Sequence, residues 1–213
     1  MKSFAICFSA ILSLMAHVCP AQKWEVGGVT GGGFGNSLTV SNPTGSASTG
    51  FSPGVAVGGF IGQNLYRQIS GELRYTFQFS NLKLFGDGTE ASFRGQTHTV
   101  QYNVLWHARP VRSRLRPFVG VGAGMRVFRG TGEENAYQPL SGFALLTKTE
   151  EWKLMAAAGA GIKYRLTPRL TLRAELWDYA TPLPSRVIAA SPGAQLGGWL
   201  HDFVPMVGLT FVY

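Results

Sequence analysis

The last eleven residues of the chain, Phe203 to Tyr213, constrain its fold more than any other segment. If the segment is a β-strand, its side chains alternate between two faces, and Val207, Leu209 and Phe211 share one face with the two end residues. The chain stops on an aromatic residue with no polar tail, although the termini of soluble domains usually fray into water. Such an ending is unusual for a soluble protein and indicates a strand with a strongly apolar environment on one side.

The same alternation recurs along the chain. In the segment 69–79, every odd position is apolar or glycine, and every even position from Ser70 to Gln78 is polar or charged. Its length is what a tilted strand needs to cross a bilayer, about 9–11 residues. Eight strands are predicted, over residues 24–33, 53–61, 69–79, 96–108, 118–128, 152–164, 170–179 and 203–213. The first two are rich in glycine and valine, and their alternation does not show which face points inward.

The composition supports a membrane-spanning β-structure. Charged residues make up 14% of the chain, against roughly 25% in soluble domains. After the N-terminal segment, no continuous apolar run is long enough for a transmembrane helix, so the apolar residues are spread over alternating strands, as in transmembrane barrels. The predicted fold class is all-β: an eight-stranded antiparallel transmembrane β-barrel. A soluble lipocalin-like barrel is the competing fold, but here one strand face is charged and the other is too hydrophobic to meet water.

The N-terminus predicts export. A short basic start precedes the apolar run Phe4–Met15, and Cys19-Pro20-Ala21 supplies a small-residue cleavage site. We therefore expect residues 1–21 to be a cleaved signal peptide and residues 22–213 to form the barrel domain. A lipoprotein signal ending at Cys19 is the alternative, disfavoured because Val18 stands where a small residue is expected. Both cysteines, Cys7 and Cys19, precede the predicted cleavage site, so neither disulfides nor thiol chemistry are expected afterwards.

Short and long connections alternate between the predicted strands. The short ones cover residues 62–67, 109–116 and 166–169, and the long ones about 34–52, 80–94, 129–151 and 180–200. Barrels of this kind have short periplasmic turns and longer extracellular loops, with both termini on the periplasmic side. The long connections are rich in Gly, Ser, Thr, Asn and Pro, so we expect irregular loops. Aromatic residues near strand ends predict interfacial girdles: Trp24, Phe79, Trp106, Trp152, Tyr164 and Tyr213.

The polar strand faces predict the contents of the lumen. The residues assigned to it are Glu72, Arg74, Gln78, Gln101, Asn103, His107, Arg126, Lys153, Lys163, Arg173 and Glu175. An eight-stranded barrel is just wide enough for its side chains to fill. Because a lone buried charge is costly, Glu72 and Glu175 should neutralise neighbouring Arg and Lys. A filled lumen is the favoured interpretation, and a narrow pore lined by the surplus basic residues is the alternative.

Two segments carry a family resemblance. Residues 116–124 (RPFVGVGAG) and 166–175 (LTPRLTLRAE) are similar to the fifth-strand and the turn–seventh-strand segments of small outer-membrane barrels. The whole chain after residue 21 resembles the OmpA/OmpX-like superfamily, the outer membrane protein β-barrel domain family of Gram-negative bacteria. The resemblance implies location in the bacterial outer membrane, contact with its lipid and lipopolysaccharide, and recognition of the closing strand ending at Tyr213 by the barrel insertion machinery. The peptidoglycan-binding domain that follows the barrel in some members is not expected.

No enzyme chemistry is predicted, and we identify no catalytic, cofactor-binding or metal-binding residues. Some eight-stranded barrels modify lipid A, which requires a Ser/His pair with an acidic partner on the outer rim. His98 and His201 are expected at the outer end without a serine at suggestive spacing, and His107 at the periplasmic end. The His201-Asp202 pair is too sparse for a metal site.

The net charge of +8 includes four arginines in one short connection, at positions 109, 112, 114 and 116. Such runs invite a nucleic-acid interpretation, which export and membrane placement exclude. A solvated turn is favoured over contact with anionic headgroups or peptidoglycan. The predicted function is a structural or adhesin-like surface protein that meets an extracellular partner through its loops. A small porin-like channel is the alternative, and a lipid A-modifying enzyme is less favoured.

Overall fold

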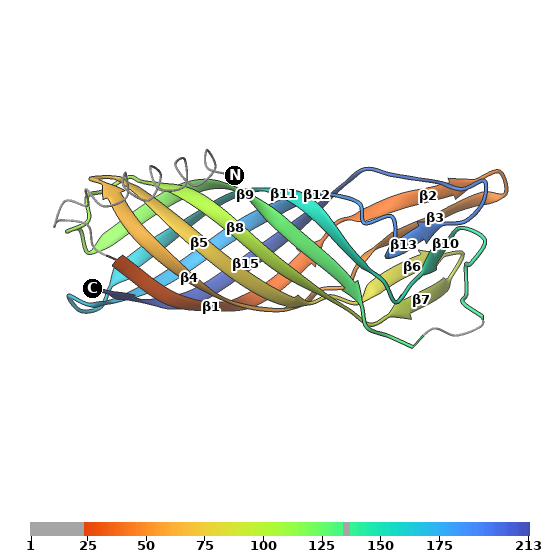
Figure 1. Ribbon diagram of the computed structural model, residues 1–213, viewed down its shortest axis with the longest axis horizontal. Coiled ribbons are helices and arrows are strands. Elements are labelled where there is room, and N and C mark those ends of the chain that lie inside the picture. The colour runs from red at the N-terminus through yellow and green to blue at the C-terminus, as the bar shows by residue number, and fades with distance from the viewer. Residues whose placement is uncertain (1–23, 134–136) are drawn as a thin grey trace, which may run out of the picture.

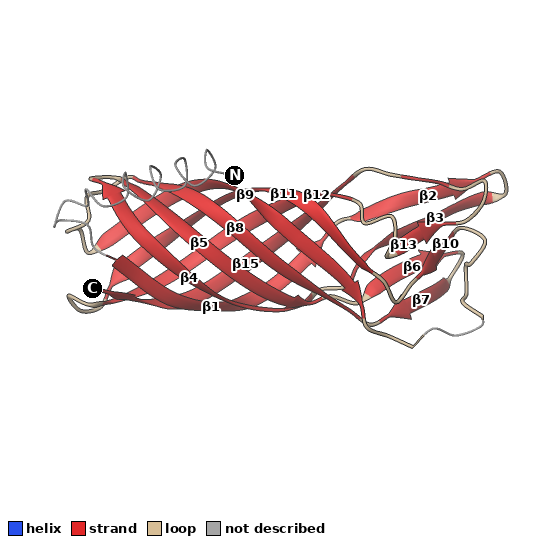
Figure 2. Ribbon diagram, in the orientation of Figure 1, coloured by secondary structure: helices blue, strands red, loops and turns tan. Residues whose placement is uncertain are grey.

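The computed structural model describes residues 24–133 and 137–213, and the predicted signal peptide, residues 1–21, lies outside these ranges. Strands dominate the described residues, with loops and turns between them (Figure 2). In these two ranges, no helix is long and apolar enough to cross a membrane.

Eight antiparallel strands close into a barrel, as predicted (Figure 1). They are β1 (Trp24–Gly35), β4 (Gly54–Tyr66), β5 (Ile69–Phe79), β8 (Gly95–His107), β9 (Leu115–Gly130), β11 (Glu150–Arg165), β12 (Leu170–Pro182) and β15 (Trp199–Val212). Around the barrel their order is β1-β15-β12-β11-β9-β8-β5-β4, and β4 pairs back with β1. The first and last strands form a seam that runs from Glu25 opposite Val212 to Gly35 opposite Asp202.

The strand β4 is longer than predicted. Residues 62–66 were expected in a turn, but β4 continues through Tyr66 and leaves only Arg67 and Gln68 between β4 and β5. The reason is that the polar side chain of Asn64 faces the lumen, where it donates a hydrogen bond to Glu25 at 3.0 Å. Asn64 therefore belongs to the inward face of a strand and not to a turn. The other two short turns cover residues 108–114 and 166–169.

The two faces of the barrel wall are inverted relative to a soluble protein. Large apolar side chains point outward, such as Val121 and Leu154, which are 64% and 75% exposed. Charged side chains point inward, such as Arg74 and Arg173, which are 1% and 0% exposed. A continuous apolar exterior of this kind is far larger than soluble monomers tolerate, because exposed apolar patches drive association or membrane contact. The alternation predicted for a membrane barrel is therefore confirmed.

Glycines on the inward face make room for aromatic rings. A Cβ atom on Gly27 would lie 2.3 Å from the ring of Phe60 and 2.6 Å from a backbone oxygen. A Cβ atom on Gly159 would lie 2.5 Å from the indole of Trp177. These close approaches need glycine because any larger residue would displace the ring. They also explain why the alternation in the first strands is blurred in the sequence.

The four long connections fold into a second β-structure beyond one end of the barrel (Figure 1). Its main sheet has the order β14-β2-β3-β6-β7, and β10 pairs separately with β13. The strands are β2 (Ser37–Asn42), β3 (Gly45–Phe51), β6 (Leu82–Gly86), β7 (Thr89–Phe93), β10 (Ala144–Leu146), β13 (Ile188–Ala190) and β14 (Gln195–Leu196). We call these connections the outer β-subdomain; the turns and both barrel termini lie at the opposite end.

The prediction that the long connections are irregular is wrong. They share a hydrophobic core in which Val40, Leu82 and Ile188 are fully buried. Phe128, at the outer end of β9, belongs to the same core and packs on Phe51 with ring centroids 5.2 Å apart. Burial of apolar side chains from all four connections stabilises the sheet, since each contributes roughly 1.5–3 kcal/mol relative to exposure. The outer β-subdomain is therefore a folded unit with a hydrophobic core of its own, to which Phe128 of β9 contributes.

Candidate functional site

A ring of four charged residues crosses the middle of the lumen. Glu72 and Arg74 belong to β5, and Arg173 and Glu175 belong to β12. These strands lie four positions apart in the ring of eight, on opposite walls. Arg74 reaches Glu175 at 2.7 Å and Arg173 reaches Glu72 at 2.8 Å, so both ion pairs span the barrel. Each arginine also pairs with the acid on its own strand, at 2.6 Å for Arg74 and 2.5 Å for Arg173.

This middle quartet is neutral and tightly enclosed. Aromatic rings stack on its guanidinium groups: Arg173 lies 4.1 Å from the ring centroid of Phe60, and Arg74 lies 5.2 Å from that of Trp177. Cations over aromatic faces gain further electrostatic stabilisation, most of all when desolvated. With two acids and two bases in mutual contact, the quartet satisfies the requirement that buried charges be paired. It joins opposite walls of the barrel through the lumen.

A second group of charges lies near the short turns, at the end of the barrel opposite the outer β-subdomain. Lys163 pairs with Glu25 at 2.6 Å, and Arg116 lies 4.0 Å from the same carboxylate. Nearby, the hydroxyl of Ser70 and Nε2 of His107 are 2.9 Å apart, and both side chains are buried. This serine–histidine pair has no acidic partner among the described residues at Nδ1 of His107, the atom through which a catalytic histidine is oriented.

A third group closes the lumen near the outer β-subdomain. Arg126 forms an ion pair with Asp202, and its guanidinium donates to Gln78 at 3.0 Å and to Thr97 at 3.3 Å. The same guanidinium lies over the ring of Phe128 at 5.3 Å. Three successive layers of paired side chains therefore occupy the lumen from one end to the other.

The predicted lumen set is largely confirmed. Of the eleven residues assigned to the lumen, all but Lys153 are buried in the barrel interior. Lys153 lies at the outer rim, 22% exposed, and pairs with Glu151 at 2.8 Å. The expectation that Glu72 and Glu175 neutralise neighbouring arginines is correct, but Lys163 pairs with Glu25 instead.

Three charged lumen residues were missed by the sequence analysis: Glu25, Arg116 and Asp202. Each stands within three residues of a strand end, where the predicted strand was weak or too short. With them included, the buried charges comprise five bases and four acids, which leaves a surplus of one. The larger basic surplus on which the pore interpretation depended is therefore mostly cancelled.

The histidines at the outer end contact groups other than serine. His98 faces outward and shares a hydrogen bond of 2.8 Å with the hydroxyl of Tyr75. His201 pairs with Asp178 at 2.9 Å and not with its sequence neighbour Asp202. Neither contact supplies the hydroxyl nucleophile that lipid deacylation by a Ser/His pair requires.

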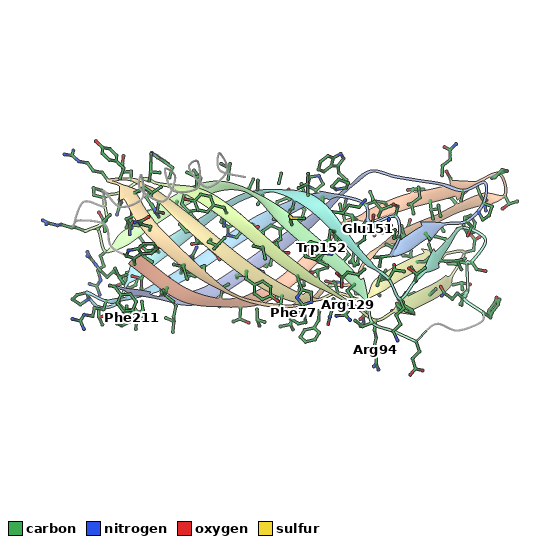
Figure 3. The ribbon with its side chains drawn as sticks, in the orientation of Figure 1. Phe77, Arg94, Arg129, Glu151, Trp152 and Phe211 are labelled. Atoms are coloured by element: carbon green, nitrogen blue, oxygen red, sulfur yellow. The ribbon has the colours of Figure 1, made fainter. Side chains whose placement is uncertain are left out.

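The outer surface of the barrel carries the predicted aromatic residues at both ends. Trp24, Trp106 and Tyr213 are exposed near the turns, and Phe79 and Trp152 are exposed near the outer β-subdomain. Tyr164 is half-buried and lies under the guanidinium of Arg114, 5.2 Å from its ring centroid. Just beyond Trp152 and Phe77, the exposed side chains Arg94 and Arg129 mark the junction with the outer β-subdomain (Figure 3).

With this geometry in place, the chain was compared with known proteins. The model of the outer membrane protein beta-barrel domain family matches residues 4–210. The chain belongs to this family. No curated protein matches the sequence significantly.

Solved structures show the same architecture at low sequence identity. Neisserial surface protein A is similar with a TM-score of 0.54 and 9% identity, over 89% of this chain and 96% of that one. The N-terminal barrel of Pseudomonas aeruginosa OprF has a TM-score of 0.45 and 16% identity, over 90% and 97%. Ail, the attachment invasion locus protein of Yersinia pestis, has a TM-score of 0.45 and 9% identity, over 89% and 99%. At 9% identity, the likeness to Neisserial surface protein A shows the fold alone: a small outer-membrane β-barrel.

Proposed function

We propose that this outer-membrane barrel is a closed structural scaffold that presents its outer β-subdomain to a partner at the cell surface. The observation that carries the proposal is the shared hydrophobic core of the four long connections. A surface that is already folded loses little conformational entropy when it binds, which favours recognition by preformed shape. Exposed apolar side chains on this unit, such as Phe85 and Leu145 at 42% and 41%, are available for contact.

The lumen supports a scaffold more than a channel. A channel needs a continuous polar path with sites that ions can enter and leave. Here the middle quartet joins opposite walls through ion pairs of 2.7 and 2.8 Å between fully buried side chains. Opening a path would require these ion pairs to separate, and each buried charge would then lose the opposite charge that stabilises it.

The exterior supports placement in a bilayer with the outer β-subdomain outside the cell. Trp152 and Phe77 lie at the end of the apolar wall, and Arg94 and Arg129 follow immediately beyond them (Figure 3). Aromatic rings favour the headgroup level, and guanidinium groups bind phosphates, which suits the phosphorylated lipopolysaccharide of the outer leaflet. The proposal includes export through a cleaved leader, residues 1–21. It also includes recognition of the strand ending at Tyr213 by the barrel insertion machinery.

Orientation can be tested with single cysteines, because Cys7 and Cys19 both lie in the proposed leader. We expect Thr89→Cys, in the exposed first residue of β7, to react with a membrane-impermeant maleimide on intact cells. Arg169→Cys, in the turn between β11 and β12, should react only after the outer membrane is permeabilised. The reverse pattern would overturn the orientation.

The surface-binding function is tested by masking the outer β-subdomain. A flexible tag between Asp87 and Gly88 extends the tip of the β6–β7 hairpin, where a Cβ on Gly88 meets no atom within 4 Å. We expect expressing cells to be retained on immobilised matrix glycoproteins or glycans, and the tag at the hairpin to abolish this retention. The same tag in the turn 166–169 is the matched control. If cells expressing the untagged protein are retained no better than cells without it, the surface-binding proposal fails.

A further inference from the structure

A small pocket opens at the turn end of the barrel, far from the outer β-subdomain. Its charged lining comes from Glu25, Arg114, Arg116, Lys163 and Arg165, and the hydroxyl residues Ser113 and Thr171 also line it. Its volume is about 40 Å³, which is room for a few water molecules, since each needs at least about 10–15 Å³. The pocket therefore has room for a group the size of a small oxyanion, but not for a sugar ring or an acyl chain.

Arg116 is the buried base of this pocket and is poorly paired. It is 5% exposed, yet its contacts are long: 3.4 Å from Nε to the carbonyl of Arg109, 3.5 Å from Nη1 to Asn64 and 4.0 Å to Glu25. Its Nη2 atom is buried and has no hydrogen-bond partner among the described residues. A buried guanidinium donor without an acceptor is costly, and an acceptor placed in the pocket would relieve that cost.

The charges around the pocket are strongly unbalanced. Four cations line it, at Arg114, Arg116, Lys163 and Arg165, against the single carboxylate of Glu25. That carboxylate is already engaged by Lys163 at 2.6 Å and by Asn64 at 3.0 Å. The other two arginines contact neutral groups: Arg114 stacks on Tyr164, and Arg165 donates to the carbonyl of Arg112. The carboxylate of Glu25 is therefore shared between Lys163 and the more distant Arg116, and the four cations outnumber it by three charges.

We propose that this pocket binds a phosphate group, either as free phosphate or as the headgroup of an anionic lipid in the periplasmic leaflet. A phosphate carries up to two negative charges and several acceptor oxygens, and guanidinium groups bind it through charge-assisted hydrogen bonds. Arg116 supplies the buried donor, Arg114 and Arg165 supply flanking charge, and the side chain of Thr171 lines the same wall. The inference is independent of the partner of the outer β-subdomain.

The test uses the folded full-length mature protein in a zwitterionic detergent. Binding of inorganic phosphate is titrated by calorimetry at constant ionic strength, with chloride as the balancing anion. Native mass spectrometry then counts bound phosphatidylglycerol, with phosphatidylcholine as the neutral-headgroup comparison. The variant Arg114→Gln/Arg165→Gln removes the flanking charge, and Arg67→Gln/Arg169→Gln removes the same charge from exposed turn residues that do not line the pocket. A heat-modifiable band on electrophoresis confirms that each variant is folded.

We expect saturable binding of inorganic phosphate, of phosphatidylglycerol or of both. Arg114→Gln/Arg165→Gln should weaken this binding about tenfold or more, and Arg67→Gln/Arg169→Gln should leave it unchanged. Binding of phosphatidylglycerol that inorganic phosphate displaces identifies a lipid headgroup site. Binding of inorganic phosphate alone identifies a site for the free ion. Equal weakening by both double variants would reveal diffuse attraction to basic turns and overturn the proposal. Absence of saturable binding in both arms would also overturn it.

Discussion

Arg173 and Glu72 stand on opposite walls of the barrel, and their side chains meet across the lumen at 2.8 Å. The mirror contact, Arg74 with Glu175, is 2.7 Å. Two strands far apart around the wall are thereby tied to each other through the interior, in addition to their hydrogen bonds to neighbouring strands. The barrel is held both around its circumference and across its diameter.

Removing one acid from the middle quartet should destabilise the barrel strongly. Glu72→Gln leaves two buried arginines with one carboxylate, and breaking a buried ion pair in this way costs about 3–5 kcal/mol. Urea unfolding in detergent or lipid vesicles, followed by tryptophan fluorescence, measures the loss. Glu90→Gln is the control, because its ion pair with Lys83 is 37% and 52% exposed and such pairs contribute about 0–1 kcal/mol. Similar losses for both variants would show that burial of the quartet does not matter to stability.

The closed lumen predicts electrical silence. The native protein should show no conductance steps in a planar bilayer, because the quartet joins opposite walls of the lumen through buried ion pairs. Replacing all four quartet residues by alanine removes this barrier without changing the net charge, and we expect small conductance steps to appear. A silent quadruple variant that is folded would place the main barrier in the clusters around Glu25 or Arg126. Regular steps from the native protein would instead favour a channel.

The packing of Phe60 over Gly27 predicts a sharp contrast between two adjacent glycines. Gly27→Val would drive a side chain into the ring of Phe60, where even a Cβ lies 2.3 Å away. Gly28→Val points outward, and the nearest atom to its Cβ is 3.7 Å away. Overpacking costs about 1–3 kcal/mol or more, so the fraction of folded, heat-modifiable protein should fall for Gly27→Val only. Partial recovery in Gly27→Val/Phe60→Leu would confirm the clash, and equal folding of the two single variants would contradict it.

A charge placed in the core of the outer β-subdomain should unfold that unit and leave the barrel folded. Leu84 is 1% exposed in its core, and Leu84→Asp buries a charge there, which apolar surroundings do not tolerate. Limited proteolysis should then cut within residues 36–53 and 80–94, while the barrel fragment stays heat-modifiable. Phe85→Asp is the matched control on the neighbouring, 42% exposed side chain. A barrel that unfolds together with Leu84→Asp would show that the two parts form one cooperative unit.

The wall of the barrel was predictable because its two environments demand opposite chemistry at alternate positions. Strand β5 shows this most clearly: its sequence predicts both its bounds, Ile69–Phe79, and the inward placement of Glu72 and Arg74. The prediction failed at strand ends, where one or two extra residues decide what is buried. Arg116 was expected in a turn, but β9 begins at Leu115 and carries the next side chain into the lumen.

The outer β-subdomain was harder to foresee because three of its seven described strands are too short for alternation to be visible. Strands β10, β13 and β14 have three, three and two residues. The hairpin of β6 and β7 did leave a signal, since Asp87-Gly88 is a two-residue turn with positive φ at both positions, 49° and 74°. The packing of the connections depends on contacts between segments far apart in the chain, such as those that contain Val40 and Ile188. A local sequence pattern does not encode such contacts.

The seam between β1 and β15 means that the barrel closes only when its first and last strands have paired. Tyr213 donates its backbone N–H to the carbonyl of Trp24 at 2.9 Å, so one of the last contacts in the chain joins one of the first described residues. Until the last strand pairs, β1 has an unpaired edge, and so does the strand on the other side of the gap. Such edges can bind other chains. Contacts of such long sequence separation also slow folding. A copy truncated before residue 199 lacks β15, so its barrel would stay open and keep two unpaired edges.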